Sequence, residues 1–174
     1  MGARLALTAA AGLLLAAALP TAAQAASTAK ADAGGGWQTI QESNREFAAG
    51  TVCSFALSNV VLQQDEQFRI ARTYPDGSTL ETDYRGPLVV QYTNEATGAS
   101  AVRDLSGTAQ NYVLPDKTSV WVSQQHFGLT VHPGDPYHAA GLYVLTGPSV
   151  FAITATGPDI LAQSQVENIC DTLG

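Results

Sequence analysis

Three histidines come closer than any other residues of this sequence to a catalytic or metal-binding cluster. They are His126, His132 and His138, and Asp135 and Tyr137 lie between the last two. Imidazole and carboxylate groups bind zinc, and the same groups serve as general bases in hydrolytic enzymes. If two of these residues met a serine or a carboxylate in a cleft, they would indicate a hydrolase or a cyclase.

The spacing of these histidines matches no local signature of a metal site. Each interval is six residues long, whereas zinc ligands recur in other, family-specific patterns. The sequence also contains no GxSxG or HExxH string. We therefore predict neither a metal ion nor a cofactor, assign no catalytic residue, and keep an enzyme as one alternative.

Acidic residues offer another kind of chemistry, because glycosidases use two carboxyl groups that face each other across a cleft. The candidates are the neighbours Asp65 and Glu66, the pair Glu81 and Asp83, and Asp116. The members of the pair are two positions apart on an expected strand, so they share one face of it. We interpret that pair as part of a solvated strand face.

Aromatic residues alternate with polar neighbours on the expected strands. Tyr92, Trp121 and Phe127 are examples, and His126 precedes the last of them. Inside a β-barrel, such side chains line a pocket for small apolar ligands. We predict these four residues as ligand-binding candidates. The alternative is that the aromatic rings only fill the core.

The first 25 residues have the composition of a secretory signal peptide. Arg4 precedes an apolar run from Leu5 to Leu19, which Pro20 ends, and Ala23-Gln24-Ala25 supplies small residues where a signal peptidase reads the chain. We therefore expect cleavage after residue 25 and a secreted, extracellular protein. The apolar run is too short for a spanning helix, so we expect no membrane anchor.

The composition after the signal peptide predicts a flexible leader and one domain. Residues 26–36 are small, polar and rich in glycine, as in a flexible leader, and residues 37–174 form one segment of domain size. The chain carries 8 basic and 15 acidic residues, a net charge of −7. Phosphate binding needs clustered Lys and Arg, so we expect no nucleic acid partner. We expect a monomer.

The only two cysteines are Cys53 and Cys170. In an oxidising compartment such a pair predicts a disulfide. Closing so long a loop stabilises a fold by about 4–5 kcal/mol at most in the chain-entropy model. A catalytic thiol is the less favoured interpretation, because the sequence contains no CxxC pair.

Short alternating runs separated by turn residues predict an all-β fold. Asp76-Gly77 between two such runs is typical of a hairpin. The spacing indicates about eight or nine strands in an antiparallel β-barrel or β-sandwich. We expect short helical segments at the two ends of the domain, one over residues 37–49 and one near the C-terminus. The first strand is expected from residue 51.

The layout resembles a family of small secreted β proteins of high-GC Gram-positive bacteria. The residues that carry the resemblance are cysteines with their neighbours and turn residues: Cys53, Phe55, Asp76-Gly77, Thr93-Asn94, Thr97-Gly98, Ser106-Gly107, Pro133-Gly134 and Ile169-Cys170. The resemblance covers most of the domain and implies a shared fold. It implies no catalytic residues, because no activity is assigned to that family.

These patterns leave three functional hypotheses open. The favoured one is a secreted, non-enzymatic domain that binds a small apolar or amphipathic ligand inside the barrel. The second is a module that binds or inhibits an extracellular protein through the rigid loop Pro133–Pro136. The third is the hydrolase or cyclase that uses the histidines.

Overall fold

The computed structural model describes residues 35–174 of the chain. The predicted signal peptide and residues 26–34 of the predicted leader lie outside the described residues. The described part is almost entirely β-structure in antiparallel sheets, which confirms the predicted fold class. No helix in this part of the chain is long and apolar enough to cross a membrane.

Four strands form the smaller sheet, in the order β2-β3-β6-β7. Their bounds are β2 Arg45–Phe47, β3 Leu57–Gln64, β6 Leu88–Asn94 and β7 Ser100–Asp104. On β6, Val90, Tyr92 and Asn94 are buried and alternate with more exposed residues, so one face of this sheet is internal.

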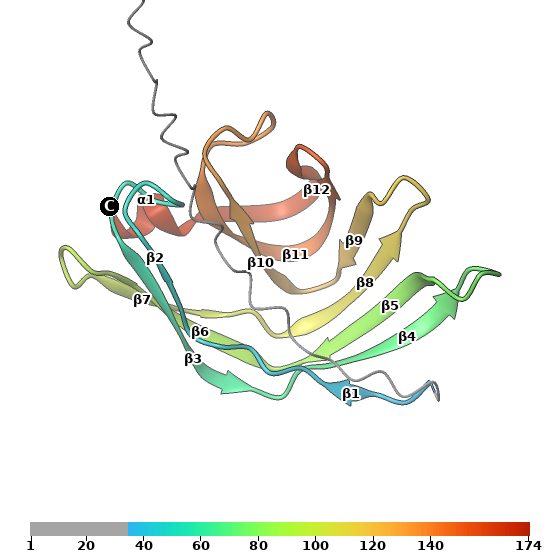
Figure 1. Ribbon diagram of the computed structural model, residues 1–174. Coiled ribbons are helices and arrows are strands. Elements are labelled where there is room, and N and C mark those ends of the chain that lie inside the picture. Colours follow the sequence, from blue (N-terminus) through green and yellow to red (C-terminus); the bar gives the residue numbers. More distant parts are fainter. Residues whose placement is uncertain (1–34) are drawn as a thin grey trace, which may run out of the picture.

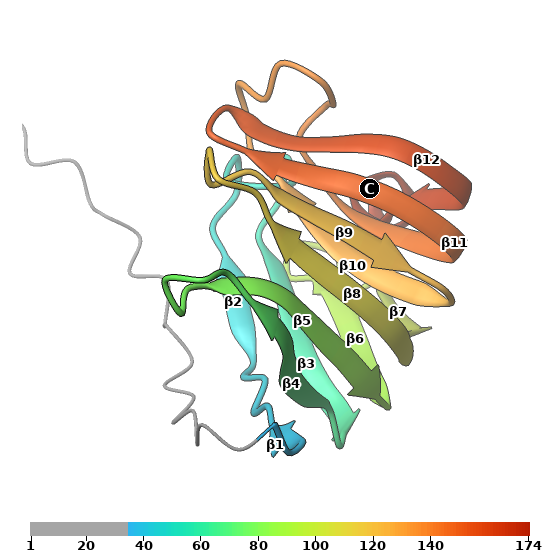
Figure 2. The same ribbon diagram turned by 90° about the vertical axis from the view of Figure 1, so that its right-hand side faces the viewer.

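Eight strands form the larger sheet, in the order β1-β4-β5-β8-β9-β11-β10, with β12 on the other edge of β11. Figure 2 shows β4, β5, β8, β9, β11 and β12 following one another across it. Their bounds are β1 Gln38–Thr39, β4 Gln67–Thr73, β5 Thr79–Gly86, β8 Gly107–Val113, β9 Ser119–Ser123, β10 His126–Val131, β11 Gly141–Thr154 and β12 Gly157–Asn168.

The hairpin between β4 and β5 confirms the sequence prediction for Asp76-Gly77. The Asp76 side chain accepts a hydrogen bond from the Ser78 amide at 2.9 Å, which closes the turn. Asp116 forms the same contact with the Thr118 amide at 2.9 Å in the turn between β8 and β9. Local side-chain chemistry therefore explains why these turns could be predicted.

Three short connections run directly from a strand of one sheet to a strand of the other and so join the two sheets. β3 leads into β4, β5 into β6, and β7 into β8, each across no more than two residues. Backbone hydrogen bonds continue through this corner: the Asp65 amide donates to Pro87 O at 3.0 Å and the Leu105 amide to Leu88 O at 2.7 Å. Figure 1 shows the sheets running into each other at this corner.

Gly86 stands at the tightest point of the corner. Its φ of +132° is one that other residues rarely adopt. A Cβ atom on this residue would overlap the carbonyl oxygen of Asp65 and lie 2.7 Å from Cα of Glu66. Only glycine therefore allows the two passages of chain to approach so closely.

The larger sheet divides at the ends of β8 and β9. These strands pair with each other, but β7 continues into the small sheet and pairs with β6, whereas β10 pairs with β11. The side chain of Gln125 lies at the point of division and accepts a hydrogen bond from the Thr108 amide at 2.8 Å. Two layers result, and the inner face of the small sheet lies opposite β10 and β11.

The first core cluster lies between these two layers and the C-terminal helix. It includes Leu57, Val90 and Tyr92 of the small sheet and Leu142 of β11. Helix α1 (Ile169–Leu173) covers one end of the cluster. The two layers with their shared core form a sandwich, because neither sheet closes on itself in the described part of the chain.

The predicted disulfide is confirmed: Cys53 and Cys170 are bonded to each other. Cys53 is buried in the first core cluster, and Cys170 lies in α1. The Asn94 side chain adds a second link, because it donates a hydrogen bond to Leu173 O at 2.9 Å. The disulfide fixes α1 to the loop before β3, and this buried hydrogen bond fixes it to β6.

Two sequence predictions about the N-terminal region were wrong. Residues 37–49 form β1 and β2 instead of a helix, because each pairs with a longer strand, β4 and β3 respectively. Cys53 and Phe55 lie in a loop, and the first long strand begins only at Leu57. At the other end of the domain, α1 is the short helical segment that the sequence predicted.

Replacing Gly86 by alanine tests whether the corner depends on this close approach. We expect Gly86→Ala to lower the free energy of unfolding by about 3 kcal/mol or more, since both the backbone strain and the overlap oppose the native fold. Gly98→Ala is the control, because φ is +75° there but a Cβ atom would meet nothing within 4 Å. We expect that variant to lose only about 1–2 kcal/mol. Urea unfolding measures both, and equal losses would contradict the account.

Candidate functional site

A cleft of about 220 Å³ lies between the inner face of the small sheet and β10. β3, β6, β10 and β11 line its sides, and the chain before β2 and the corner residue Glu66 line its mouth. The residues around it are Glu42, Ser43, Arg45, Asn59, Val61, Glu66, Leu88, Val90, Tyr92, Leu105, Phe127, Gly128, Thr130 and Leu142.

The inner part of the cleft is apolar apart from one hydroxyl group. Val90, Tyr92 and Leu142 are 3 %, 2 % and 4 % exposed, so this end reaches the core. The Tyr92 hydroxyl has no hydrogen-bond partner among the described residues. Burial raises the pKa of Tyr92 to about 12, although the charge of Arg103 opposes the rise. The hydroxyl is therefore a neutral group that can both donate and accept a hydrogen bond.

Gly128 provides much of the space in the cleft. It lies within β10, where the sequence would otherwise place a side chain facing the small sheet. A Cβ atom there would lie 3.1 Å from Cδ1 of Leu105 and 3.9 Å from the hydroxyl oxygen of Tyr92. A glycine inside a strand often marks a place where another group approaches closely. Here its missing side chain leaves room beside the unpaired hydroxyl.

Glu66 is the acidic group at the mouth that has no partner of its own. Its carboxylate forms no hydrogen bond or ion pair with any described residue. Burial, and to a smaller extent the negative charge of Glu42, raise the pKa of Glu66 to about 7. Near neutral pH, comparable fractions of this carboxyl group are therefore protonated and ionised.

Glu42, in contrast, is held by neighbouring groups. Its carboxylate lies 3.2 Å from the Arg45 guanidinium, and its backbone forms two hydrogen bonds with the Gln64 side chain, at 2.7 Å and 3.0 Å. These contacts fix the chain before β2 against β3. The mouth thus carries the carboxylates of Glu42 and Glu66 and the guanidinium of Arg45, and its net charge is negative.

Two of the four predicted ligand-binding residues line this cleft. Tyr92 and Phe127 do, whereas Trp121 and His126 do not. Trp121 belongs to a row of aromatic rings in the larger sheet, with its ring centroid 5.0 Å from Tyr84 and 6.0 Å from Phe151. Phe127 lies between the cleft and this aromatic row, because its ring centroid is also 4.7 Å from that of Phe151.

The three histidines do not converge. His126 begins β10 opposite Thr146, and His132 Nδ1 lies 3.2 Å from the backbone oxygen of Thr51. His138 Nε2 accepts a hydrogen bond from the Ile160 amide at 2.9 Å. Each ring thus contacts a different element. Among residues 35–174, no group of three metal-ligating side chains is close enough to hold an ion.

The loop from Pro133 to Pro136 is braced from within by Asp135. One oxygen of the Asp135 carboxylate accepts hydrogen bonds from the Tyr137 and His138 amides, both at 2.8 Å, and the other is buried. Tyr137 is 47 % exposed. His138 Nε2 also lies 3.8 Å from the carboxylate of Asp159 on β12, so one histidine and one acid are close to each other here.

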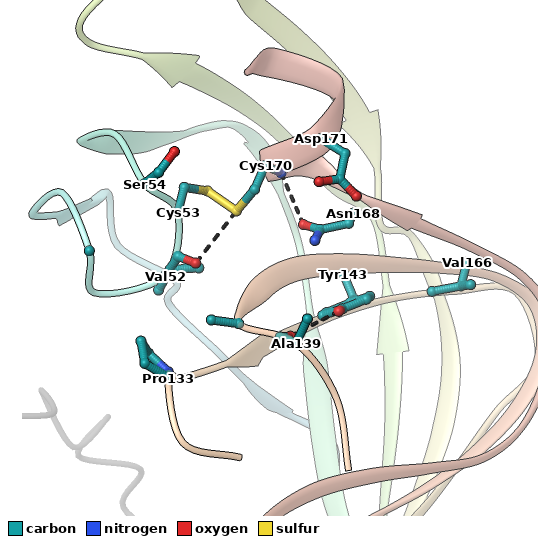
Figure 3. Close-up of a pocket in the computed structure, with 12 residues that line it drawn as sticks. Val52, Cys53, Ser54, Pro133, Ala139, Tyr143, Val166, Asn168, Cys170 and Asp171 are labelled. Carbon is teal, nitrogen blue, oxygen red and sulfur yellow. Dashed lines mark hydrogen bonds between the residues drawn. A yellow bond between two sulfur atoms is a disulfide. The ribbon is translucent and has the colours of Figure 1, made fainter. Parts of the chain in front are cut away.

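A second, wider hollow lies beside the disulfide, between α1 and two loops (Figure 3). Its volume is about 630 Å³. Two of its polar side chains are engaged in the fold: Asn168 accepts a hydrogen bond from the Cys170 amide at 3.0 Å, and the Tyr143 hydroxyl donates to Ala139 O at 2.9 Å. Unlike the cleft, this hollow contains none of the four predicted ligand-binding residues.

The paired acidic residues of β5 lie on the outer face of the larger sheet. The Asp83 carboxylate lies 2.8 Å from the Arg69 guanidinium, and Glu81 forms an ion pair with Arg72. Both carboxylates are therefore engaged in ion pairs along a strand face, and neither faces another acid across a cleft.

Comparison of the chain with protein-family models, with curated proteins and with solved structures finds no match in any of the three. The resemblance to secreted proteins of high-GC Gram-positive bacteria therefore stays a prediction. The function is therefore inferred from the geometry of the cleft.

Sequence reasoning did not assign Glu66, Leu105 or Gly128 to a site. Glu66 was considered only as one of several carboxylates, and the glycine within a run of strand residues was the one available signal. Nothing in the pattern indicated that Leu105 would face Gly128, because that contact depends on the division of the larger sheet.

If His138 is structural, replacing it should affect one neighbouring amide. We expect His138→Ala to leave the Ile160 amide without its acceptor, to speed its hydrogen exchange and to cost about 1 kcal/mol of stability. His138→Gln, which retains an acceptor, is the matched control. NMR hydrogen exchange measures the effect, and an unchanged Ile160 amide in the alanine variant would contradict this role.

The raised pKa of Glu66 predicts a pH-dependent stability. Since the folded protein holds this proton more tightly than the unfolded chain, with a pKa near 7 against the ordinary 4.5, the protein loses stability as pH rises between these values. Glu66→Gln removes the effect, so we expect its stability advantage over the natural protein to grow from pH 4.5 to 7. Chemical unfolding at several pH values measures this. A constant difference would show that Glu66 is not buried as described.

Proposed function

We propose that this protein is a secreted, non-enzymatic domain that binds a small apolar or amphipathic molecule in the cleft between the small sheet and β10. One observation carries the proposal: the cleft reaches the core and ends at a hydroxyl group, that of Tyr92, which no described residue satisfies. This hydroxyl can both donate to and accept from a ligand, and a hydrogen bond formed beside the apolar lining of the cleft favours binding.

The dimensions of the cleft set the size of the ligand. An apolar cavity of about 150 Å³ is large enough to hold benzene, so the cleft of about 220 Å³ suits a molecule only somewhat larger. Val90, Leu105 and Leu142 offer apolar contacts to its body. Binding sites for small molecules commonly combine such a lining with a few well-placed polar groups.

Secretion is part of the proposal and rests on two features. The N-terminal residues have the composition of a signal peptide. The bond between Cys53 and Cys170 is of the kind that persists in an oxidising compartment. An extracellular ligand is the simplest consequence of that location.

Ligand binding has more support than the two other hypotheses. A protein-binding module was expected to present a protruding loop. Asp135 braces Pro133–Pro136 from within, and the following His138 is fixed to β12 through the Ile160 amide. The large exposed apolar residues are spread over three strands, one turn and one loop: Val60, Leu62, Val102, Leu114, Tyr137, Leu161 and Val166. A hydrolase or cyclase needed converging histidines, which lie apart.

A substitution that fills the cleft tests the proposal. We expect 2-phenylethanol, a neutral probe of suitable size, to bind the natural protein and to shift the NMR signals of Leu105 and Gly128. In Gly128→Ala the added methyl group would press on Leu105, so we expect at least about tenfold weaker binding. Gly36→Ala is the control, because a methyl group there meets nothing within 4 Å. If the probe binds all three proteins equally, or none of them, the cleft is not the binding site.

A further inference from the structure

We propose that the natural ligand of the cleft is an organic cation, a protonated amine on a small apolar body, and that Glu66 binds its ammonium group. This inference rests on the proposed function, because it names the class of ligand for the same cleft. It goes beyond that function by assigning the charge of the ligand and the residue that selects it.

The charges at the mouth favour a cation. Two carboxylates, Glu42 and Glu66, lie there with one guanidinium, that of Arg45, which is 3.2 Å from the Glu42 carboxylate, so the net charge of the mouth is negative. The Arg45 side chain is 56 % exposed and is already engaged, which makes it a poor anchor for an anion. The whole chain, with a net charge of −7, also attracts cations.

The position of Glu66 suits the recognition of an ammonium group. It is half-buried at the corner between β3 and β4, and its backbone oxygen accepts a hydrogen bond from the Ile40 amide at 2.8 Å. The backbone is therefore fixed while the carboxylate has no partner. A charge-assisted hydrogen bond to such a partly desolvated carboxylate is stronger than one formed in water.

The titration of Glu66 adds a signature that a neutral ligand would lack. The charged groups that line the cleft are Glu66 itself, Glu42 and Arg45. Tyr92 is the titratable group at the inner end, where the ion pair of Arg103 and Glu167 also acts on it. With a pKa of about 7, roughly half of the Glu66 carboxyl groups carry a proton at neutral pH. An ammonium ligand pairs with the ionised form, so its binding releases a proton from the protonated fraction.

The two ends of the cleft together define the ligand. The ammonium group lies at Glu66, and the apolar body lies among Val90, Leu105 and Leu142, next to the free hydroxyl of Tyr92. The volume of the cleft suits a body with an aromatic ring and a short chain, roughly eight to ten non-hydrogen atoms in all. An arylalkylamine has this shape and charge.

Calorimetric titration with two probes tests the inference. Phenethylamine and 2-phenylethanol have almost the same shape, but only the first is a cation. The ionised fraction of Glu66 rises from about one-tenth at pH 6 to about nine-tenths at pH 8. We therefore expect the affinity for the amine to rise about tenfold over this range, with proton release near pH 7, and the affinity for the alcohol to stay constant.

Two variants identify the group responsible. We expect Glu66→Gln to bind the amine at least about tenfold more weakly at pH 8 and to bind the alcohol as the natural protein does. Glu46→Gln removes an equal charge from an exposed position on β2 and serves as the control, which we expect to behave like the natural protein. Retained binding of the alcohol shows that the cleft is intact in Glu66→Gln.

Each outcome separates this inference from the proposed function. If both probes bind the natural protein equally at every pH, the cleft binds small molecules but the assignment of a cation is wrong. The same conclusion follows if Glu66→Gln keeps its full affinity for the amine. If neither probe binds, both the proposed function and this inference fail.

Discussion

The structure depends on the division of one sheet where β8 and β9 end. Up to that point the two strands pair, and beyond it their continuations, β7 and β10, join different layers. Gln125 accepts the hydrogen bond of the Thr108 amide at the division, while its own backbone oxygen accepts one from the Gly147 amide at 2.5 Å. Backbone groups that lose a strand partner must find another. Gln125 meets this need for β8 and β11.

The cleft follows directly from this division. Because β7 and β10 part, the inner face of the small sheet and β10 are separated by a space that side chains fill only in part. Gly86 allows the connection between β5 and β6 to pass close to Asp65 and Glu66, which connect β3 and β4. This close approach places Glu66 at the mouth of the cleft. At the far end, the disulfide and α1 close the core against solvent. A rigid framework therefore holds the apolar interior and the acidic mouth in a fixed relation.

The features that the sequence predicted correctly are those with local causes. Asp76-Gly77 predicted a hairpin through turn chemistry, and two cysteines in an oxidising context predicted one bond. The prediction of a helix over residues 37–49 was wrong. Their apolar spacing fits a helix loosely, but they form β1 and β2, which pair with strands that come later in the sequence. The single run of residues 120–131 belongs to two strands in the structure, β9 and β10, which pair with different parts of β11, and periodicity alone does not reveal such a break.

The candidate site could be predicted only in part, for a related reason. Tyr92 and Phe127 were identified because aromatic residues on alternating strands usually face an interior. Trp121 fits the same pattern, yet it packs in the aromatic row of the larger sheet. Gly128 and Leu105 face each other only after the sheet divides. Contacts of this kind depend on the pairing of whole strands, which no short pattern encodes.

A crystal of the protein under xenon pressure would test the central claim, that the cleft is open and apolar at its inner end. Xenon occupies apolar cavities and requires no knowledge of the natural ligand. We expect an anomalous scattering peak inside the cleft, among Val90, Leu105 and Leu142, and a Tyr92 hydroxyl without a protein partner. A cleft filled by its own side chains, with no xenon and with that hydroxyl bonded within the protein, would contradict the account.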